Sequence, residues 1–235
     1  MHGVGSRNKL TPSHARHYPT PCTLDVLGRS ICRVGCLPRK ELHEAWEMAT
    51  RVRSTFRGGR VIDLCAGFGL LAQVMLLLDD SSPEAVAVDA WLPQNHAKVF
   101  DAVAEAFPRI RGRVSFVQAR LEDVALAVDD VVVSSHACGA LTDAVLDRAT
   151  RAGARVAVLP CCHAVRFRTD LAAYTDRALA MDDERIARVR EVGYRAWTES
   201  IPAEVSPKNR LVLAAPYDDG PALPSGSSQS IAIHS

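Results

Sequence analysis

The residues Val61-Ile62-Asp63-Leu64-Cys65-Ala66-Gly67-Phe68-Gly69-Leu70-Leu71 decide the fold of this chain. A short apolar run ends in a glycine turn, and a second apolar run over 70–78 is too long to be one strand. The stretch therefore predicts a buried strand, a sharp turn and the start of a helix. Glycine has no Cβ, so Gly67 and Gly69 let the backbone turn and let a ligand approach closely. The first amides of the helix would face that ligand.

Strand-like and helix-like runs alternate along most of the chain. The expected strands are 61–66, 85–89, 114–118, 130–134, 155–159, 194–200 and 210–215, and the expected helices are 41–56, 70–78, 97–107, 140–152 and 170–192. This alternation predicts an α/β fold with a doubly wound, mostly parallel sheet that is covered on both faces. No helix separates the last two strands, so they are expected to form an antiparallel hairpin at the sheet edge.

The composition indicates a single soluble domain. Of the 235 residues 48% are apolar, which is enough for one sizeable core. No window approaches the ~20 apolar residues of a membrane span, so no membrane association is expected. Seven cysteines, an odd number, favour reduced thiols in the cytoplasm over a disulfide framework. The sequence indicates no obligatory protein partner.

Charge is distributed unevenly between the two parts of the chain. Residues 1–60 hold eleven Lys/Arg against four Asp/Glu, whereas residues 61–235 hold seventeen against twenty-three. We expect residues 1–30 to form an irregular basic arm, 31–217 to form the domain with its N-terminal helix, and 218–235 to form a disordered tail. A basic arm on an acidic body is typical of a nucleic-acid contact, and a solvated leader is the alternative interpretation.

The glycine turn resembles motif I of the class I methyltransferases. Its pattern Asp-x-x-x-Gly-x-Gly lacks the third glycine of the dinucleotide fingerprint, which makes a nicotinamide dehydrogenase the weaker interpretation. Five strand–helix units followed by a hairpin are also the architecture of that methyltransferase class. The resemblance implies a Rossmann-like, seven-stranded fold and S-adenosyl-L-methionine (SAM) as the cofactor.

Polar and small residues follow the strand ends that are expected to hold SAM. Asp89 ends the second strand, and the two oxygens of a carboxylate suit the hydroxyls of a ribose. In the class that this chain resembles, an acid or amide after the third strand meets adenine, which points to Glu122 or Gln118. The expected cofactor-binding residues are Asp63, Ala66, Gly67, Gly69, Asp89, Ala90, Glu122 and Ser134.

Two loops rich in cysteine and histidine follow the fourth and fifth strands. They read His-Ala-Cys-Gly-x-x-Thr-Asp over 136–143 and Pro-Cys-Cys-His over 160–163. The carboxyl ends of parallel strands share one edge, so we expect the two loops to lie side by side. A hydroxyl acceptor must lose a proton, so one of the two histidines is a candidate base. The candidate catalytic residues are His136, Cys138, Cys161, Cys162 and His163.

This pair of motifs resembles one methyltransferase family in particular. The family includes the eukaryotic tRNA acceptor-stem 2′-O-methyltransferase, bacterial relatives and the methyltransferase half of a glutathione-transferase-like protein. The similarity covers about residues 30–216, including Pro38-Arg39-Lys40-Glu41 and Pro207-Lys208-Asn209-Arg210. It implies methyl transfer to an RNA hydroxyl. A phosphate or carboxylate of the substrate would meet Arg39, Lys40, Lys208 and Arg210.

Several alternatives remain open at this point. A small-molecule methyltransferase acting on a metabolite or natural product is consistent with the net charge of +1, and a non-catalytic SAM- or RNA-binding module is a third possibility. The cysteines of the two loops are alternatively zinc ligands or a transient nucleophile. Adjacent cysteines do not easily ligate one ion tetrahedrally, so we expect no metal. Cys65 is expected to be a small buried hydrophobe inside the first strand.

Overall fold

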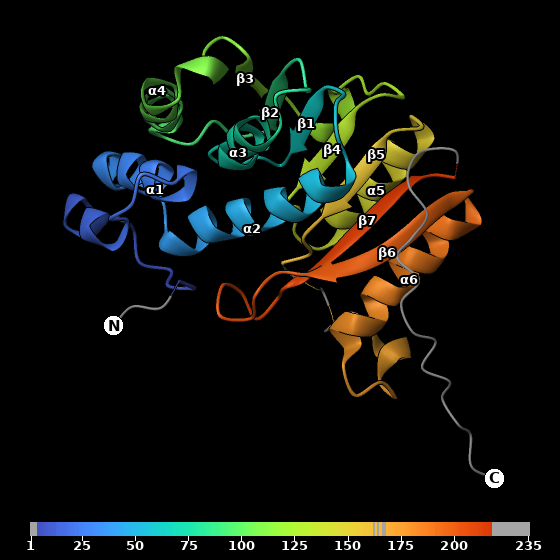
Figure 1. The fold of residues 1–235 in the computed structure, drawn as a ribbon. Helices are drawn as coiled ribbons and strands as arrows, with labels where there is room; N and C mark the ends of the chain where they lie inside the picture. The colour runs from blue at the N-terminus through green and yellow to red at the C-terminus, as the bar shows by residue number, and fades with distance from the viewer. Residues whose placement is uncertain (1–3, 162, 164, 166–167, 218–235) are drawn as a thin grey trace.

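A computed structural model describes residues 4–161, 163, 165 and 168–217. Seven strands form one sheet in the order β3-β2-β1-β4-β5-β7-β6 (Figure 1). Their bounds are β1 Val61–Leu64, β2 Ala85–Asp89, β3 Val114–Gln118, β4 Val131–Ser134, β5 Arg155–Val158, β6 Tyr194–Ser200 and β7 Arg210–Pro216. The first five strands are parallel, and β7 is antiparallel to both β5 and β6. The predicted mostly parallel sheet with a C-terminal antiparallel hairpin is therefore confirmed.

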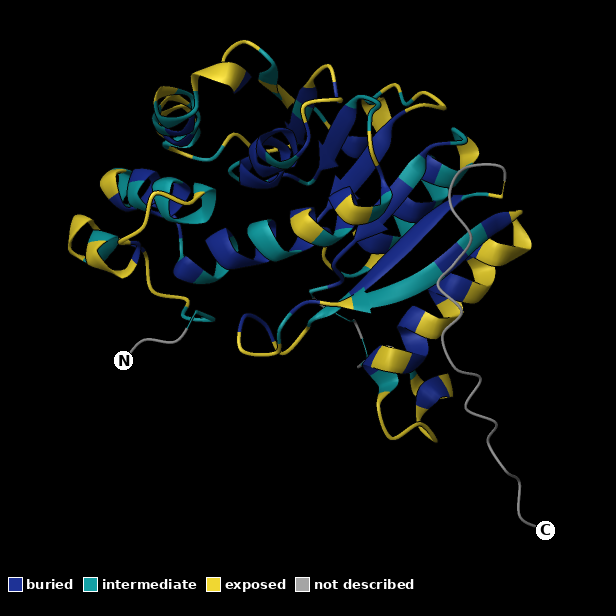
Figure 2. Ribbon diagram, viewed as in Figure 1, coloured by how far each residue is buried: buried dark blue, intermediate teal, exposed yellow. Residues whose placement is uncertain are grey.

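Helices cover both faces of the sheet. They are α1 Thr23–Val34, α2 Arg39–Thr55, α3 Leu70–Leu78, α4 His96–Ala106, α5 Ala140–Arg151 and α6 Arg177–Glu191, with short 3₁₀ helices η1 Pro12–His17, η2 Pro108–Ile110, η3 Leu121–Asp123 and η5 Thr169–Leu171. Successive strand residues point to opposite faces, so Val61 joins the core under α2 and α3 while Ile62 joins the core under α5 and α6. The strands β1, β4, β5 and β7 are almost entirely buried, whereas the edge strands β3 and β6 are only partly buried (Figure 2).

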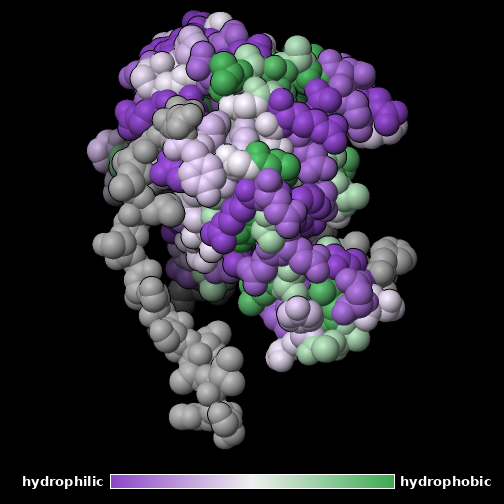
Figure 3. Space-filling view, turned by 90° about the vertical axis from the view of Figure 1, so that its right-hand side faces the viewer, coloured by the Kyte–Doolittle hydropathy of each residue, from purple (hydrophilic) through white to green (hydrophobic). Residues whose placement is uncertain are grey.

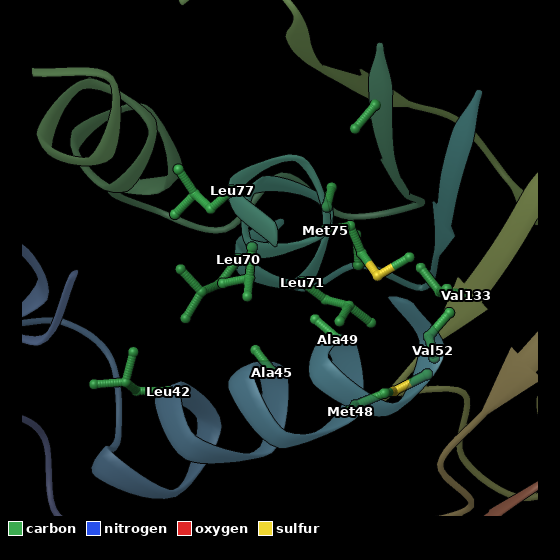
Figure 4. Packing of buried hydrophobic residues seen from close by; sticks show 14 of the residues in the cluster. Leu42, Ala45, Met48, Ala49, Val52, Leu70, Leu71, Met75, Leu77 and Val133 are labelled. Atoms are coloured by element: carbon green, nitrogen blue, oxygen red, sulfur yellow. The ribbon is translucent and has the colours of Figure 1, made fainter. Parts of the chain in front are cut away.

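Helices α2 and α3 pack on each other over β1 and β4. Leu42, Ala45, Ala49 and Val52 recur at helical spacing along α2, and they face the apolar helix α3 (Figure 4). Helix α3 is buried along nearly its whole length, which explains why its sequence is apolar all round. This packing fixes the start of α3, and with it the glycine turn, against the sheet.

The N-terminal region is more ordered than its sequence suggests. Residues 1–30 were expected to be irregular, but η1 and the first eight residues of α1 together take up 14 of these 30 residues. Leu27 and Ile31 of α1 are fully buried, and Leu10 and Tyr18 join the same core. Leu27 and Ile31 are four positions apart and so lie on one face of α1, and burying that face stabilises the helix despite its short length. The expected tail over 218–235 lies outside the described residues.

The surface on the side of the molecule that carries α6 is mainly hydrophilic (Figure 3). Figure 3 shows the face that carries α6, where polar residues predominate and apolar ones occur in small separate areas. Among the described residues no helix is both long enough and apolar enough to cross a membrane.

Candidate functional site

The strand order reverses between β1 and β4, so a crevice is expected at their carboxyl ends. The glycine turn lies there, between β1 and α3. The N–H of Gly67 donates to Asp89 Oδ2 at 2.9 Å, and the N–H of Trp91 donates to Asp89 Oδ1 at 3.0 Å. The structure thus brings Gly67 and Asp89 together, as the sequence predicted, and each carboxylate oxygen retains a lone pair for a ligand hydroxyl.

The surroundings that would meet a side chain differ between the two glycines of the turn. Both have positive φ, 54° at Gly67 and 71° at Gly69. A Cβ on Gly69 would lie 2.8 Å from the Phe100 ring and 2.9 Å from the Ala87 Cβ. Gly69 is therefore required for close packing of α3 on β2, whereas the space at Gly67 is bounded by the ring of His136. Packing alone accounts for the glycine at position 69, and close approach of a ligand to the turn remains a prediction.

Cys65 lies just after β1 and not inside it, which corrects the expected strand 61–66. Its φ of 57° is in the left-handed region, where non-glycine residues are uncommon. Burial raises the pKa of the Cys65 thiol to about 12, and the charges of Asp89 and Asp63 contribute. Cys65 is half-buried and packs against the core from the turn, so the expectation of a fully buried hydrophobe inside the strand is wrong.

Asp63 is fully buried at the end of β1. Its Oδ2 accepts from the N–H of Ala72 at 3.2 Å, and its Oδ1 has no hydrogen-bond partner within the described part of the chain. Burial raises the pKa of Asp63 to about 8, against the opposing effect of the Ala72 N–H, and the nearby Asp89 adds to the rise. A buried carboxyl with an open acceptor fits a cationic ligand, and SAM carries both a sulfonium and an ammonium group.

The remaining predicted cofactor residues lie around this turn. Ala66 is buried and its N–H donates to the Val88 carbonyl at 3.0 Å. Ser134 ends β4 and has a buried Oγ with no partner among the described residues. Gln118 donates to the Ala90 carbonyl at 3.3 Å, which joins the ends of β2 and β3. Glu122 is exposed and forms an ion pair with Arg120 at 3.3 Å. Its negative charge also contributes to the raised pKa of Cys65.

His136 extends over the glycine turn from the loop after β4. A Cβ on Gly67 would lie 3.5 Å from His136 Cδ2 and 3.9 Å from Nε2. Glu41, in the first turn of α2, is close enough for its charge to interact with His136. Burial raises the pKa of Glu41, while His136 acts in the opposite direction. Glu41 was not predicted as a site residue, because its proximity to His136 depends on how α2 crosses the sheet.

The two cysteine loops meet as predicted. Cys138 Sγ lies 3.2 Å from Cys161 Sγ, and Cys138 also contributes to the field at Cys65. Residues from the ends of β1, β4 and β5 therefore gather at one edge. Cys162 lies outside the described residues. His163 faces the other way, toward α6, where its Nε2 lies 2.8 Å from Asp182 Oδ1. Among the residues described, none form a group of three or more that would hold a metal ion.

The four predicted substrate cations do not form one cluster. Arg39 is buried with its guanidinium over the Tyr18 ring, 5.8 Å from the centroid. Lys40 forms an ion pair with Glu44 one helical turn away. Arg210 forms an ion pair with Asp183 at 2.6 Å, and Lys208 is exposed. Lys208 forms none of the described ion pairs, but its charge acts on Asp176, the residue that caps α6.

These residues lie where the strand order of a doubly wound sheet reverses, which is where sheets of this kind bind their ligands. A family model described as a methyltransferase domain matches residues 40–166, which is more than half of the chain. The chain belongs to this methyltransferase domain family. It is a SAM-dependent methyltransferase.

Comparison with curated proteins gives no match. Among solved structures, the B. subtilis m1A22 tRNA methyltransferase TrmK is 16% identical with a TM-score of 0.46, over 72% of this chain and 64% of that one. A precorrin-6y C5,15-methyltransferase from Geobacter metallireducens is 15% identical with a TM-score of 0.46, over 72% and 84%. An O-methyltransferase family protein from Burkholderia thailandensis is 18% identical with a TM-score of 0.47, over 88% and 63%. At these identities the likeness concerns the fold alone.

A cysteine variant tests whether the site uses a covalent intermediate. We expect Cys161→Ala to retain at least a tenth of the wild-type rate of methyl transfer, because the thiol pair fills space between two loops. Loss of an essential nucleophile would instead cost on the order of 10³-fold or more. Initial rates at saturating SAM measure the effect, and Cys22→Ala, an exposed cysteine before α1, is the matched control. A rate below a thousandth would establish the nucleophile.

Proposed function

We propose that this enzyme transfers the methyl group of SAM to a hydroxyl group of RNA. The observation that carries the proposal is the location of the His136 ring against the Gly67 turn, beside the expected cofactor site. When bound, SAM supplies a methyl group on a positively charged sulfur. His136 takes the proton of the acceptor hydroxyl, and alignment of that hydroxyl provides much of the acceleration. Asp63, Gly67 and Asp89 hold the cofactor, and Glu41 lies close enough to His136 for the charges of the two groups to interact.

The motif resemblance and the surface charge favour RNA as the acceptor. The segment before η1 runs along the start of α2, where the Arg39 N–H donates to the Asn8 carbonyl at 3.1 Å. This segment is therefore close to Glu41 and to the site. Its neighbourhood exposes several cations, and two of them, Lys9 on the segment and Lys98 on α4, both act on the buried Cys36. The exposed cations of this region are Arg7, Lys9, Arg16, Arg33 and Lys98.

The first experiment measures transfer of a labelled methyl group from SAM to an extract of cells that lack this gene. The labelled products are split into two samples, and one of them is treated with ribonuclease. Label that ribonuclease releases, and that digestion to nucleosides locates on a ribose oxygen, is the expected result. Label that remains in the low-molecular-weight fraction would contradict an RNA acceptor and leave the methyltransferase activity in place.

Charge reversal on this surface should weaken RNA binding. With Lys9→Glu, Arg16→Glu and Arg33→Glu combined, we expect RNA affinity at low salt to fall on the order of 10²-fold, because three phosphate contacts are lost. The slope of log affinity against log salt should become shallower by about one per cation removed. SAM affinity should not change. Filter binding at several salt concentrations measures both quantities.

A control reverses two exposed cations near the amino ends of the parallel strands, away from the carboxyl ends where the candidate site lies. Arg111 precedes β3 and Arg151 ends α5, and both are exposed. The pair Arg111→Glu and Arg151→Glu should leave RNA affinity within about threefold of wild type. Equal losses in the two sets would mean that net charge, and not this surface, governs RNA binding.

A small-molecule acceptor is the second candidate, and one observation favours it. Three of the four cations expected to bind a substrate already have a partner in the protein. Arg39 stacks on Tyr18, Lys40 pairs with Glu44, and Arg210 pairs with Asp183. A compact, weakly charged acceptor would need none of them. The ribonuclease division described above separates this candidate from RNA.

A further inference from the structure

A chain of buried polar contacts links the two cysteine–histidine loops through α6. His163 Nε2 lies 2.8 Å from Asp182 Oδ1, and Arg185 Nη1 lies 2.8 Å from the same oxygen. The Arg185 guanidinium also contacts both carboxylate oxygens of Asp143, at 3.1 and 3.0 Å. Side chains of His163, Asp182 and Arg185 are 4%, 2% and 2% exposed. We call the four residues Asp143, Arg185, Asp182 and His163 the α6 relay.

The direction of each hydrogen bond in the α6 relay follows from the chemistry of its members. Arginine has only N–H donors, so Asp182 Oδ1 must accept from Arg185. An ionised carboxylate only accepts, so His163 must donate its Nε2–H to the same oxygen. Its Nδ1 is buried without a partner in the described part of the chain, which is consistent with a proton on Nε2. The ring of His163 is therefore held in one orientation and one tautomer.

At the far end of the relay, Arg185 and Asp143 keep each other ionised. Burial lowers the pKa of Arg185, but hydrogen bonds and charges from Asp143 and Asp182 outweigh burial and raise it. Burial raises the pKa of Asp143, but Arg185 and Arg188 outweigh burial and lower it. Asp143 thus anchors a charged arginine that in turn fixes Asp182.

The relay joins the same two loops whose thiols touch at the site. Asp143 and its neighbour Thr142 lie in the first turn of α5, directly after the loop that follows β4, and Thr142 Oγ1 donates to the Ala137 carbonyl of that loop at 2.5 Å. His163 belongs to the loop after β5, two positions beyond Cys161. The Cys138–Cys161 contact of 3.2 Å lies between these anchors. A shift of His163 relative to α6 would therefore move Cys161 relative to the loop that carries His136.

We propose that Asp182 is a positioning residue for methyl transfer: through His163 it holds Cys161 in place against Cys138 at the acceptor side. Asp182 and Arg185 follow no strand and match no motif, and only the packing of α6 brings them to the site. This proposal rests on the proposed function only in locating the acceptor at this edge. An alignment error of about 1 Å can cost on the order of 10²-fold in rate, which is the scale of effect expected here.

The first test observes His163 directly by NMR of ¹⁵N-histidine-labelled enzyme. We expect a His163 Nε2–H proton that exchanges slowly with water, because it is buried and hydrogen-bonded to a carboxylate. Asp182→Ala should abolish that resonance, and Asp182→Asn should retain it because the amide oxygen still accepts. Absence of the resonance from the wild-type spectrum would overturn the proposal, whether or not the variants fold.

The second test is a double-mutant cycle on the rate of transfer. Asp182→Ala and His163→Ala should each lower the turnover rate about 10²-fold, and the double variant should be no slower than either, because both remove one contact. His163→Gln, whose amide can donate to Asp182, should recover most of the rate. SAM affinity by calorimetry should stay within twofold of wild type throughout.

Glu184→Ala is the matched control, since Glu184 lies on α6 and pairs with Arg168 at the surface. It should change neither the resonance nor the rate. Folded single variants with a wild-type rate, additive losses in the double variant, or loss of SAM affinity would each overturn the positioning role. Rates are counted in whichever fraction the wild type labels, so a non-RNA acceptor would contradict the proposed function without affecting this result.

Discussion

Gly67→Arg is expected to reduce SAM affinity by at least 10²-fold while the protein remains folded. At a φ of 54° a residue with a Cβ is strained by roughly 1–2 kcal/mol, which a domain of this size tolerates. The new side chain begins 3.5 Å from the His136 ring and has to extend through the space between the turn and that ring. That space is where the cofactor is expected, so the arginine excludes it and adds a positive charge beside a cationic ligand. Calorimetric titration with SAM measures the loss.

Gly112 provides a matched control for this substitution. Its φ is 75°, and a Cβ there would meet nothing within 4 Å. Gly112→Arg therefore carries a similar backbone strain without blocking anything, and SAM affinity should remain within about twofold of wild type. If both variants lose affinity equally, strain is the cause. If Gly67→Arg binds SAM normally, the cofactor lies elsewhere.

The sheet was predictable because its strands alternate with helices and are nearly continuous apolar runs. The expected strands 85–89 and 194–200 coincide with β2 and β6. The strand 61–66 was two residues too long, because Cys65 and Ala66 are apolar but belong to the turn. The pattern of hydrophobicity does not distinguish an extended residue from one at positive φ, whereas the observed φ of Cys65 does.

Helix α1 was not predicted, for a different physical reason. The surrounding residues are rich in proline, histidine and arginine, which is typical of irregular chain. Yet Leu27 and Ile31 fall on one face and are fully buried. Their burial against the neighbouring helices stabilises α1, and local propensity carries no information about that contact.

In the candidate site, the residues at strand ends could be predicted from their order in the chain, whereas those brought in by helix packing could not. Gly67, Asp89 and His136 were predictable because each follows a strand end, and parallel strands end at one edge. Glu41 and Asp182 were not, because each lies on a helix whose crossing brings it to the site. The opposite orientation of the two candidate bases, with His136 over the turn and His163 toward α6, also depends on side-chain directions that periodicity does not determine.

Proton release on SAM binding is the second large effect expected from this site. Asp63 has a pKa raised to about 8, so near pH 7 most of the free enzyme carries a neutral Asp63. A bound cation favours the carboxylate, so binding should release close to one proton. SAM affinity should then rise by up to tenfold per pH unit between pH 6 and 8. Calorimetry in buffers of different ionisation enthalpy counts the protons.

The same shift sets the sign of the stability change in the free enzyme. The unfolded chain loses the Asp63 proton near pH 4, whereas the folded chain keeps it until about pH 8. Between these values the folded state binds more protons, so the contribution of Asp63 to the free energy of unfolding falls as pH rises and is lost above pH 8. Thermal unfolding of the free enzyme should therefore show a midpoint that declines across this window.

Asp63→Asn separates these effects from other titrating groups. The amide has nearly the same shape and stays neutral, so the free variant should be at least as stable as wild type at pH 8 and should lack the decline from Asp63. Its SAM affinity should fall on the order of 10²-fold, because an interaction between buried charges is lost. The ammonium group of SAM itself titrates near pH 8, and any proton release that it causes persists in the variant. If SAM binding to Asp63→Asn still releases a full proton, that proton comes from SAM. If the variant binds SAM as tightly as wild type, Asp63 supports the turn without contacting the cation.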